Sequence, residues 1–170
     1  ANYQLTYDHS QQLVLSGGID WDKEDVGDSI SQWASAEQDR SGYILANRDN
    51  TGVFFGGYFD NENVIVNATV RRDYHSEFGA NSTYNFSVGV PLFNNGVIRT
   101  SFGTGFKAPS FNDASSIWGT NPDLQAEQSA NFELGYSFKR AEESYDIALF
   151  NNEIDNLVVW RAQGPENVAI

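Results

Sequence analysis

The chain has 170 residues, which is enough for one domain with a substantial core. Its 23 acidic and 10 basic residues give a formal net charge of −13, which argues against nucleic acid and anionic lipid as partners, because both require a basic face. The sequence contains no Cys, which excludes disulfides, thiolate metal sites and cysteine nucleophiles, and no apolar run is long enough for a transmembrane helix.

Apolar residues alternate with polar or small residues along most of the chain, and this period of two is typical of β-strands with one apolar face. In chain order, the alternating segments are residues 2–8, 13–22, 53–59, 64–73, 85–90, 98–103, 131–139, 145–149 and, more weakly, 157–160. An aromatic content of 14% and the presence of 15 Gly also favour strands over helices. We therefore predict an all-β chain of about nine antiparallel strands in an up-and-down meander.

The connections between these segments alternate in length. Short polar turns fall at residues 9–10, 60–63, 93–96 and 140–143, whereas longer irregular loops cover residues 26–50 and 107–126. The connection at residues 75–80 is brief and breaks this pattern. Short turns at one end of a sheet and long loops at the other are typical of membrane β-barrels.

Alternation alone does not distinguish a membrane barrel from a soluble β-sandwich, because both present one apolar face. The polar faces here carry small uncharged residues with scattered charges, as a wet lumen would, and aromatic residues gather near the predicted strand ends, as an interfacial girdle would. Those aromatic residues are Tyr3, Tyr7, Trp21, Tyr84, Tyr145 and Trp160. The pattern favours a partial transmembrane barrel. A soluble sandwich that binds carbohydrate through Trp33 and Trp118 stays open as the alternative.

The same alternation assigns side chains to the two faces of the predicted sheet. We expect the outward apolar face to include Val64, Val66, Val70, Phe132, Leu134, Tyr136 and Phe138. Arg71, Arg99 and Glu133 fall on the opposite, polar face.

Few residues suit catalysis or metal binding. His9 and His75 have no second His or converging carboxylate in the pattern, and no nucleophile elbow or phosphate-binding glycine loop is present. Asp20, Asp22 and Asp25 are weak candidates for binding a cation through carboxylate oxygens, but EF-hand spacing is missing and a solvated rim is the simpler interpretation. We expect no catalytic residue, no cofactor and no enzyme activity.

One block of sequence resembles the TonB-dependent outer-membrane receptors. Residues 99–111 and 121–129 are similar to the strand–loop–strand signature of that family, with Thr120 and Ala126 in place of its usual Gly and Pro. The motif positions are Gly103, Gly105, Phe106, Lys107, Ala108, Pro109, Asn121, Pro122, Leu124, Glu127 and Ser129. Physically the block is architectural, because glycines allow a strand to bend at the rim and Pro109 cannot donate to a strand ladder.

An upstream block resembles one class within that family. Residues 71–79 are similar to a segment of the vitamin B12 (cobalamin) receptors, and residues 50–55 to the strand before it. The resemblance implies uptake of a scarce, bulky nutrient across the bacterial outer membrane, with cobalamin as the expected ligand and a siderophore or other metal chelate as the alternative. It also implies that residues 1–170 are an internal stretch of the barrel facing outer-membrane lipid, with the plug domain and the closing C-terminal strands outside the chain.

The resemblance further places ligand contacts on rim aromatics and polar loop residues, with TonB driving release in the full-length receptor. Candidates are Trp33, Tyr43, Tyr84, Trp118 and Asn121, for each of which a girdle or packing role is the simpler interpretation. Prepared alone, the chain is expected to self-associate, because its terminal strands and its apolar face would lack their partners.

Overall fold

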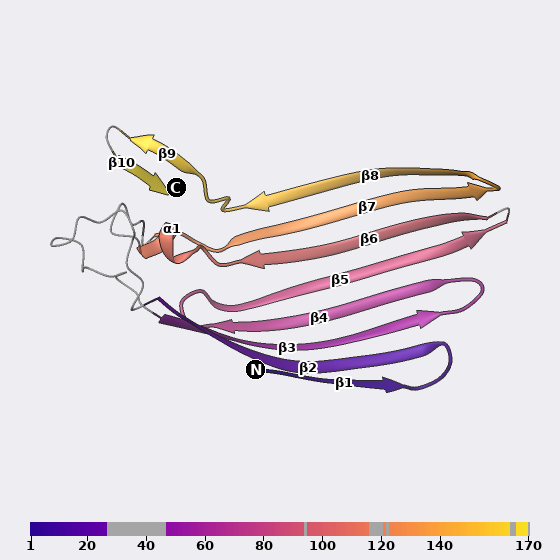
Figure 1. The fold of residues 1–170 in the computed structure, drawn as a ribbon, viewed down its shortest axis with the longest axis horizontal. Helices are drawn as coiled ribbons and strands as arrows, with labels where there is room; N and C mark the ends of the chain where they lie inside the picture. The colour runs from indigo at the N-terminus through magenta and orange to yellow at the C-terminus, as the bar shows by residue number, and fades with distance from the viewer. Residues whose placement is uncertain (27–46, 94, 116–120, 122, 164–165, 170) are drawn as a thin grey trace.

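The computed structural model describes residues 1–26, 47–93, 95–115, 121, 123–163 and 166–169. Eight antiparallel strands form one sheet in which every strand pairs with its neighbours in sequence (Figure 1). These strands are β1 (Asn2–Asp8), β2 (Leu13–Asp25), β3 (Asn47–Asp60), β4 (Ile65–His75), β5 (Gly79–Leu92), β6 (Gly96–Lys107), β7 (Glu127–Arg140) and β8 (Glu143–Asp155). The predicted meander is confirmed, and the order differs from the Greek key of most β-sandwiches.

The ninth predicted strand, at residues 157–160, is wrong. Residues 157–159 are outside any strand, and β9 (Trp160–Gln163) starts at the end of that segment and pairs with β10 (Glu166–Ala169). The reason is a contact from a residue distant in the sequence, because the backbone N–H of Val158 donates to the Glu127 carboxylate, 2.9 Å away, instead of to a neighbouring strand.

A short helix, α1 (Phe111–Ser115), forms in the connection after β6 and was not predicted. None of the helical segments in the described residues has the length and apolar character that a membrane-crossing helix needs.

The connections have different lengths at the two ends of the sheet, as predicted (Figure 1). At one end, which we call the turn end, residues 9–12, 61–64, 93–95 and 141–142 join successive strands. At the other, which we call the loop end, lie the longer connections from β2 to β3 and from β6 to β7, together with the brief turn between β4 and β5. Asn95 and Ala141 adopt left-handed φ values of 63° and 50° at the turn end, which gives those turns the backbone twist of tight hairpins.

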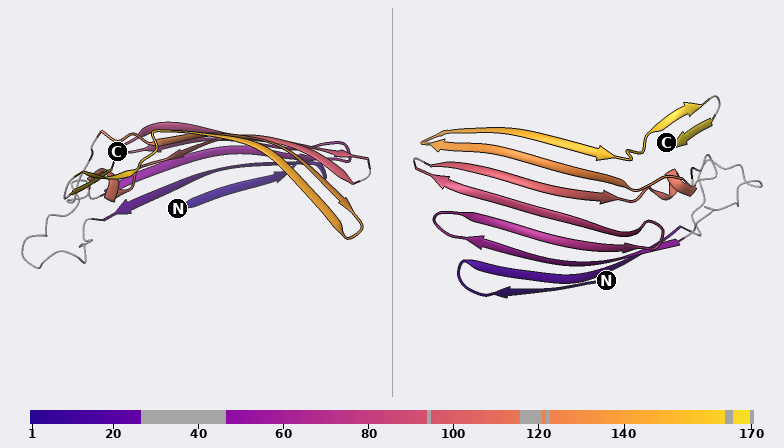
Figure 2. Two further views of the ribbon diagram at one scale, coloured as in Figure 1. Left: turned by 90° about the horizontal axis from the view of Figure 1, so that it is seen from above. Right: turned by 180° about the vertical axis from the view of Figure 1, so that it is seen from behind.

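The sheet is a single curved layer (Figure 2). Among the described residues, the buried apolar side chains are the small ones of Pro109 and Ala126, while large apolar side chains on every strand of the sheet are exposed. The register confirms the predicted faces for residues within strands: Val66 and Val70 share one face with Phe132, Leu134, Tyr136 and Phe138, and the opposite face carries Arg71, Arg99 and Glu133. Val64, predicted on the same face as Val66, lies instead in the turn before β4. A face this apolar and this exposed requires a covering that the described part of the chain does not supply.

The apolar face is a band that crosses the strands obliquely. On β3 the apolar residue of this face nearest the loop end is Val53, and the strand register places Asp155 of β8 level with it. On β8, however, the apolar residue of this face nearest the loop end is Leu149, six residues before Asp155. Between β3 and β8 the edge of the band therefore moves about 20 Å along the strand direction, while the five strand spacings total about 24 Å across the sheet. The strands are thus inclined by about 40° to the normal of the band. Strands of membrane barrels tilt by about 35–45°, so the band has the slope that surrounding lipid would impose.

Candidate functional site

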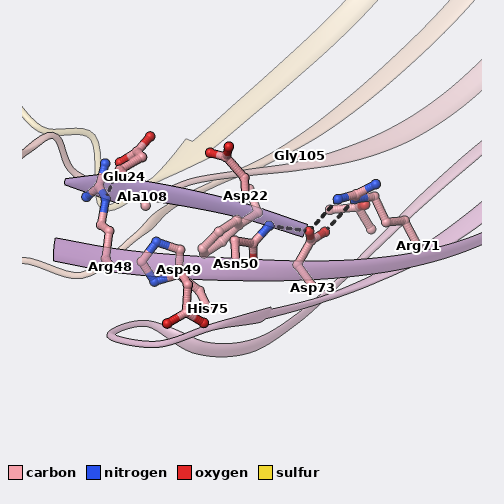
Figure 3. A pocket seen from close by; sticks show the side chains of 12 residues that line it. Asp22, Glu24, Arg48, Asp49, Asn50, Arg71, Asp73, His75, Gly105 and Ala108 are labelled. Carbon is pink, nitrogen blue, oxygen red and sulfur yellow. Dashed lines mark hydrogen bonds and ion pairs between the residues drawn. The ribbon is translucent and has the colours of Figure 1, made fainter. Parts of the chain in front are cut away.

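A hollow of about 520 Å³ lies at the loop end of the polar face, lined by β2, β3, β4, β5 and the end of β6 (Figure 3). Charged side chains dominate its lining: Asp22, Glu24, Asp49, Asp73, Arg48 and Arg71. His75 and the motif residues Gly105, Phe106 and Ala108 complete much of the rest. The hollow thus brings together the two sequence blocks that carry the family resemblance.

Arg71 organises the floor of this hollow. Its guanidinium group donates two hydrogen bonds to Asp20 on β2, at 2.6 and 2.9 Å, and two to Asp73 on its own strand, both at 2.7 Å. Asn50 on β3 donates to the same Asp73 carboxylate at 2.8 Å, as Figure 3 shows. The guanidinium lies directly over Gly52, where any Cβ would come within 1.9 Å of it. Arginine, carboxylates and glycine together join β2, β3 and β4 on the polar face.

A second arginine repeats this arrangement nearer the turn end. Arg99 on β6 lies over Gly135 on β7 and makes a bidentate pair with Asp146 on β8, at 2.7 and 2.8 Å. Its Nε also donates to Glu133 at 3.2 Å. In both cases an arginine crosses above a glycine on the adjacent strand to reach an aspartate one strand further on. Each cluster therefore ties three strands together without a hydrophobic core.

The rest of the upstream block builds the β4–β5 turn. His75 is buried, and its Nδ1 accepts hydrogen bonds from the backbone N–H groups of Glu77 and Phe78, at 3.1 and 3.3 Å. Its ring packs at a tilt against Phe78 and lies edge-on to Phe106. Gly79 has a φ of 68°, a left-handed conformation that favours glycine. These interactions give His75 a structural role in the β4–β5 turn. They also explain why Phe78 and Gly79 follow His75 at fixed positions in the upstream block.

Several residues of the family motif have structural roles. Gly105 pairs with Ser129, whose hydroxyl would lie 2.6 Å from a Cβ at Gly105, so a larger residue there would require the Ser129 hydroxyl to turn away. Glu127 receives Lys107 at 3.1 Å and the Val158 N–H at 2.9 Å. Asn121 accepts the Asp123 N–H on its side chain at 3.0 Å, which forms an Asx turn ahead of β7. Pro122 lies outside the described residues.

The hollow also contains an arginine that the sequence did not single out. Arg48, near the start of β3, donates to Glu24 on β2 and to the backbone oxygen of Pro109, which follows β6. Its guanidinium carbon lies 4.3 Å from the centre of the Phe111 ring. No local pattern marks this residue, because its partners come from segments far away in the sequence.

The predicted ligand contacts are not brought together by the described structure. Tyr84 lies on the apolar face, in the row of Val70, which suits a girdle residue better than a contact on the polar face. Asn121 lies in the turn before β7. Trp33, Tyr43 and Trp118 lie outside the described residues, so their role stays a prediction.

The three weak cation candidates divide between the two faces. Asp20 and Asp22 are two residues apart on β2 and therefore share one face of the sheet. Asp25 comes three residues after Asp22 and lies on the opposite face. Asp20 is engaged by Arg71. Within the described residues no three His, Cys, Asp or Glu side chains are grouped as metal ligands. The interpretation of Asp20, Asp22 and Asp25 as one convergent site is therefore not supported.

The family model for the β-barrel of TonB-dependent receptors matches residues 1–169. The chain belongs to this family. TonB-dependent receptors are β-barrels of the outer membrane, so the sheet is a stretch of barrel wall in that membrane, and its oblique apolar band faces lipid. The soluble sandwich considered from the sequence is wrong, because the strands form one meandering sheet of a membrane-barrel family.

Curated relatives of this receptor chain include three proteins named vitamin B12 transporter BtuB. That of Photobacterium profundum is 29% identical over 98% of the chain and 26% of its own length. Those of Vibrio vulnificus strains CMCP6 and YJ016 are 28% and 30% identical, over 92% and 90% of the chain and 24% of each relative. The chain therefore spans about a quarter of the length of these relatives.

Solved structures share the fold of this receptor chain at lower identity. The siderophore receptor PirA of Pseudomonas aeruginosa has a TM-score of 0.74 and 20% identity over 99% of the chain and 36% of its own. A mutant of the ferric enterobactin receptor PfeA of the same organism, in complex with enterobactin, has a TM-score of 0.70 and 17% identity over 95% of the chain and 27% of its own. The FrpB iron transporter of Neisseria meningitidis has a TM-score of 0.68 and 14% identity over 99% of the chain and 30% of its own.

Proposed function

We propose that the chain forms part of the barrel wall of a receptor that takes up vitamin B12 (cobalamin) across the outer membrane, without catalysing a reaction, and whose ligand release is driven by TonB. The observation that carries this proposal is that all three curated relatives described above are named vitamin B12 transporters and align over 90% or more of the chain. The two blocks that resemble cobalamin receptors also meet at the hollow at the loop end.

A siderophore receptor is the second candidate, because PirA and PfeA share the fold. Electrostatics favours cobalamin over an anionic chelate. The hollow is lined by four carboxylates and two guanidinium groups, and Arg71 is already engaged by Asp20 and Asp73. Ferric catecholate complexes carry several negative charges, which such a wall repels, whereas the negative phosphate of cobalamin is balanced within the molecule by its cobalt centre.

Uptake assays distinguish the two candidates. The gene product that contains this chain would be expressed in a bacterial strain that lacks its own cobalamin and catecholate receptors, with and without TonB. We expect TonB-dependent accumulation of radiolabelled cyanocobalamin and none of ferric enterobactin. Accumulation of ferric enterobactin alone would replace the cobalamin proposal with the siderophore one, and accumulation of neither ligand would contradict both.

A further inference from the structure

Arg48 joins three segments that lie far apart in the sequence. Only 10% of its side chain is exposed, although it lies on a sheet without a core. Its Nε donates to Glu24 on β2, and its Nη1 donates to the Pro109 oxygen at 2.6 Å. The face of its guanidinium group is occupied by the Phe111 ring at the start of α1. One side chain on β3 therefore makes an ion pair with β2, and a charged hydrogen bond and a cation–π contact with the segment after β6.

These contacts cross the loop end of the sheet. β4 and β5 lie between β3, which carries Arg48, and β6, which precedes Pro109, so the two strands are about 14 Å apart. The Arg48 side chain and the segment after β6 therefore meet across the ends of β4 and β5. Ala108 at its start and Arg48 at its attachment both line the hollow. The segment thus borders the mouth of the hollow.

The segment is also structured locally. Ser110 and Asp113 form a reciprocal capping box at the start of α1: the Ser110 N–H donates to the Asp113 carboxylate at 3.0 Å, and the Asp113 N–H donates to the Ser110 hydroxyl at 3.3 Å. Pro109 is buried and has a fixed φ. We call residues 108–115 the strap, because they form a short ordered unit that continues from β6 and that Arg48 contacts at Pro109 and Phe111.

We propose that Arg48 is a latch that holds the strap across the loop end of the polar face and thereby limits access to the hollow. Arginine suits this role because its donors point in two directions while its planar face accepts an aromatic ring, whereas the compact ammonium group of lysine has neither the fixed fork of donors nor the planar face. Glu24 orients the guanidinium group, and the Pro109 oxygen is available because pairing of β6 ends before it. The proposal concerns the movement of the strap and does not depend on which ligand the receptor takes up.

Hydrogen–deuterium exchange on the gene product that contains this chain tests the latch. In Arg48→Gln we expect the amides of residues 108–115 to exchange at least tenfold faster, while the amides of the β3–β4 and β4–β5 hairpins keep the parent rates. Arg48→Lys should be intermediate. Arg140→Gln removes the same charge from an exposed site at the turn end and should leave exchange in the strap unchanged. Unchanged exchange in Arg48→Gln, or an equal rise throughout the sheet, would overturn the proposal.

Access to the hollow is measured separately, with Thr83→Cys as a reporter in the lining. The chain has no cysteine of its own, so labelling by a water-soluble maleimide reports on this position within it. We expect Arg48→Gln to accelerate labelling at least fivefold, and Arg140→Gln to have no effect. Faster exchange in the strap without faster labelling would disprove the control of access. If Arg48→Gln does not fold, Glu24→Gln should give the same changes at smaller size, and parent-like behaviour of that variant would count against the latch.

Discussion

Replacing Gly52 with Ala tests whether the ion cluster around Arg71 stabilises the barrel wall. A Cβ at this position would lie 1.9 Å from Nη2 and 2.5 Å from Cζ of Arg71, which no side chain tolerates. The backbone of β3 is fixed by ladders on both sides, so the guanidinium group has to move. It would then lose its hydrogen bonds to Asp20 and Asp73, and Asp73, which is buried, would keep only its bond from Asn50.

The size of the effect follows from the exposure of the partners. Hydrogen bonds to charged groups contribute about 1.5–3 kcal/mol when they are buried and much less when they are exposed. The Arg71 and Asp20 side chains are 30% and 24% exposed, so their ion pair contributes little to the free energy of unfolding. The larger contribution comes from buried Asp73, which would lose its hydrogen bonds from Arg71. Against a gain of about 0.5–1 kcal/mol from removing a strand glycine, we expect Gly52→Ala to lower the free energy of unfolding by about 2 kcal/mol.

Urea titration of the receptor folded in lipid vesicles measures this change. Gly57→Ala on the same strand is the matched control, because its Cβ would only touch the mobile end of Leu15, at 3.3 Å. The decisive variant adds Arg71→Gln, whose side chain ends before the atoms that clash. In that background Gly52→Ala should cost less than about 0.5 kcal/mol, because the two residues interact only through the clash. An equal cost with and without Arg71, or no cost at all, would refute the explanation.

Three further predictions address the membrane face, the β4–β5 turn and the open sheet edges. Ile147→Lys, in the middle of the apolar band on β8, should lower the stability of the vesicle-folded receptor by about 2–4 kcal/mol, while Glu153→Lys beyond the band should change it little, and equal effects would contradict the assigned band. Gly79→Val should cost about 1–2 kcal/mol through backbone strain alone, since a Cβ there meets nothing within 4 Å, and Gly79→Asn should cost less in the same titration. Residues 1–170 prepared alone should scatter light as aggregates in detergent-free buffer, through the edges of β1 and β8 and the apolar face, and a stable monomer there would be evidence against this.

The sequence predicted the strands well because their signal is local. The alternation of Phe132, Leu134, Tyr136 and Phe138 with small or polar residues depends on nothing outside β7, and lipid on one side enforces it along the whole strand. The weak segment at residues 157–160 failed because a distant residue, Glu127, captures the Val158 N–H. The short helix α1 had a readable signal, since Ser110 and Asp113 are spaced as a capping box directly after Pro109.

The site was less predictable, because its geometry depends on register across several strands. Arg71 could be assigned to the polar face, yet its bonds to Asp20 follow from pairing through β3, which alternation does not reveal. Arg48 has no local signature at all. From the sequence, an aromatic residue near a strand end, such as Tyr84, is consistent both with an interfacial girdle and with a ligand contact. The strand register places Tyr84 on the apolar face.

The pairing of each strand only with its sequence neighbours also bears on how such walls change over evolutionary time. A hairpin carries both of its strands and their turn in one continuous stretch of gene, so duplicating or deleting it leaves every other pairing intact and alters only the circumference. The same event would break pairings in a Greek-key sheet, because some of its neighbouring strands are encoded far apart in the gene. Duplication or deletion of hairpins thus changes the number of strands in a barrel by two at a time. This agrees with the even strand numbers of single-chain bacterial outer-membrane barrels.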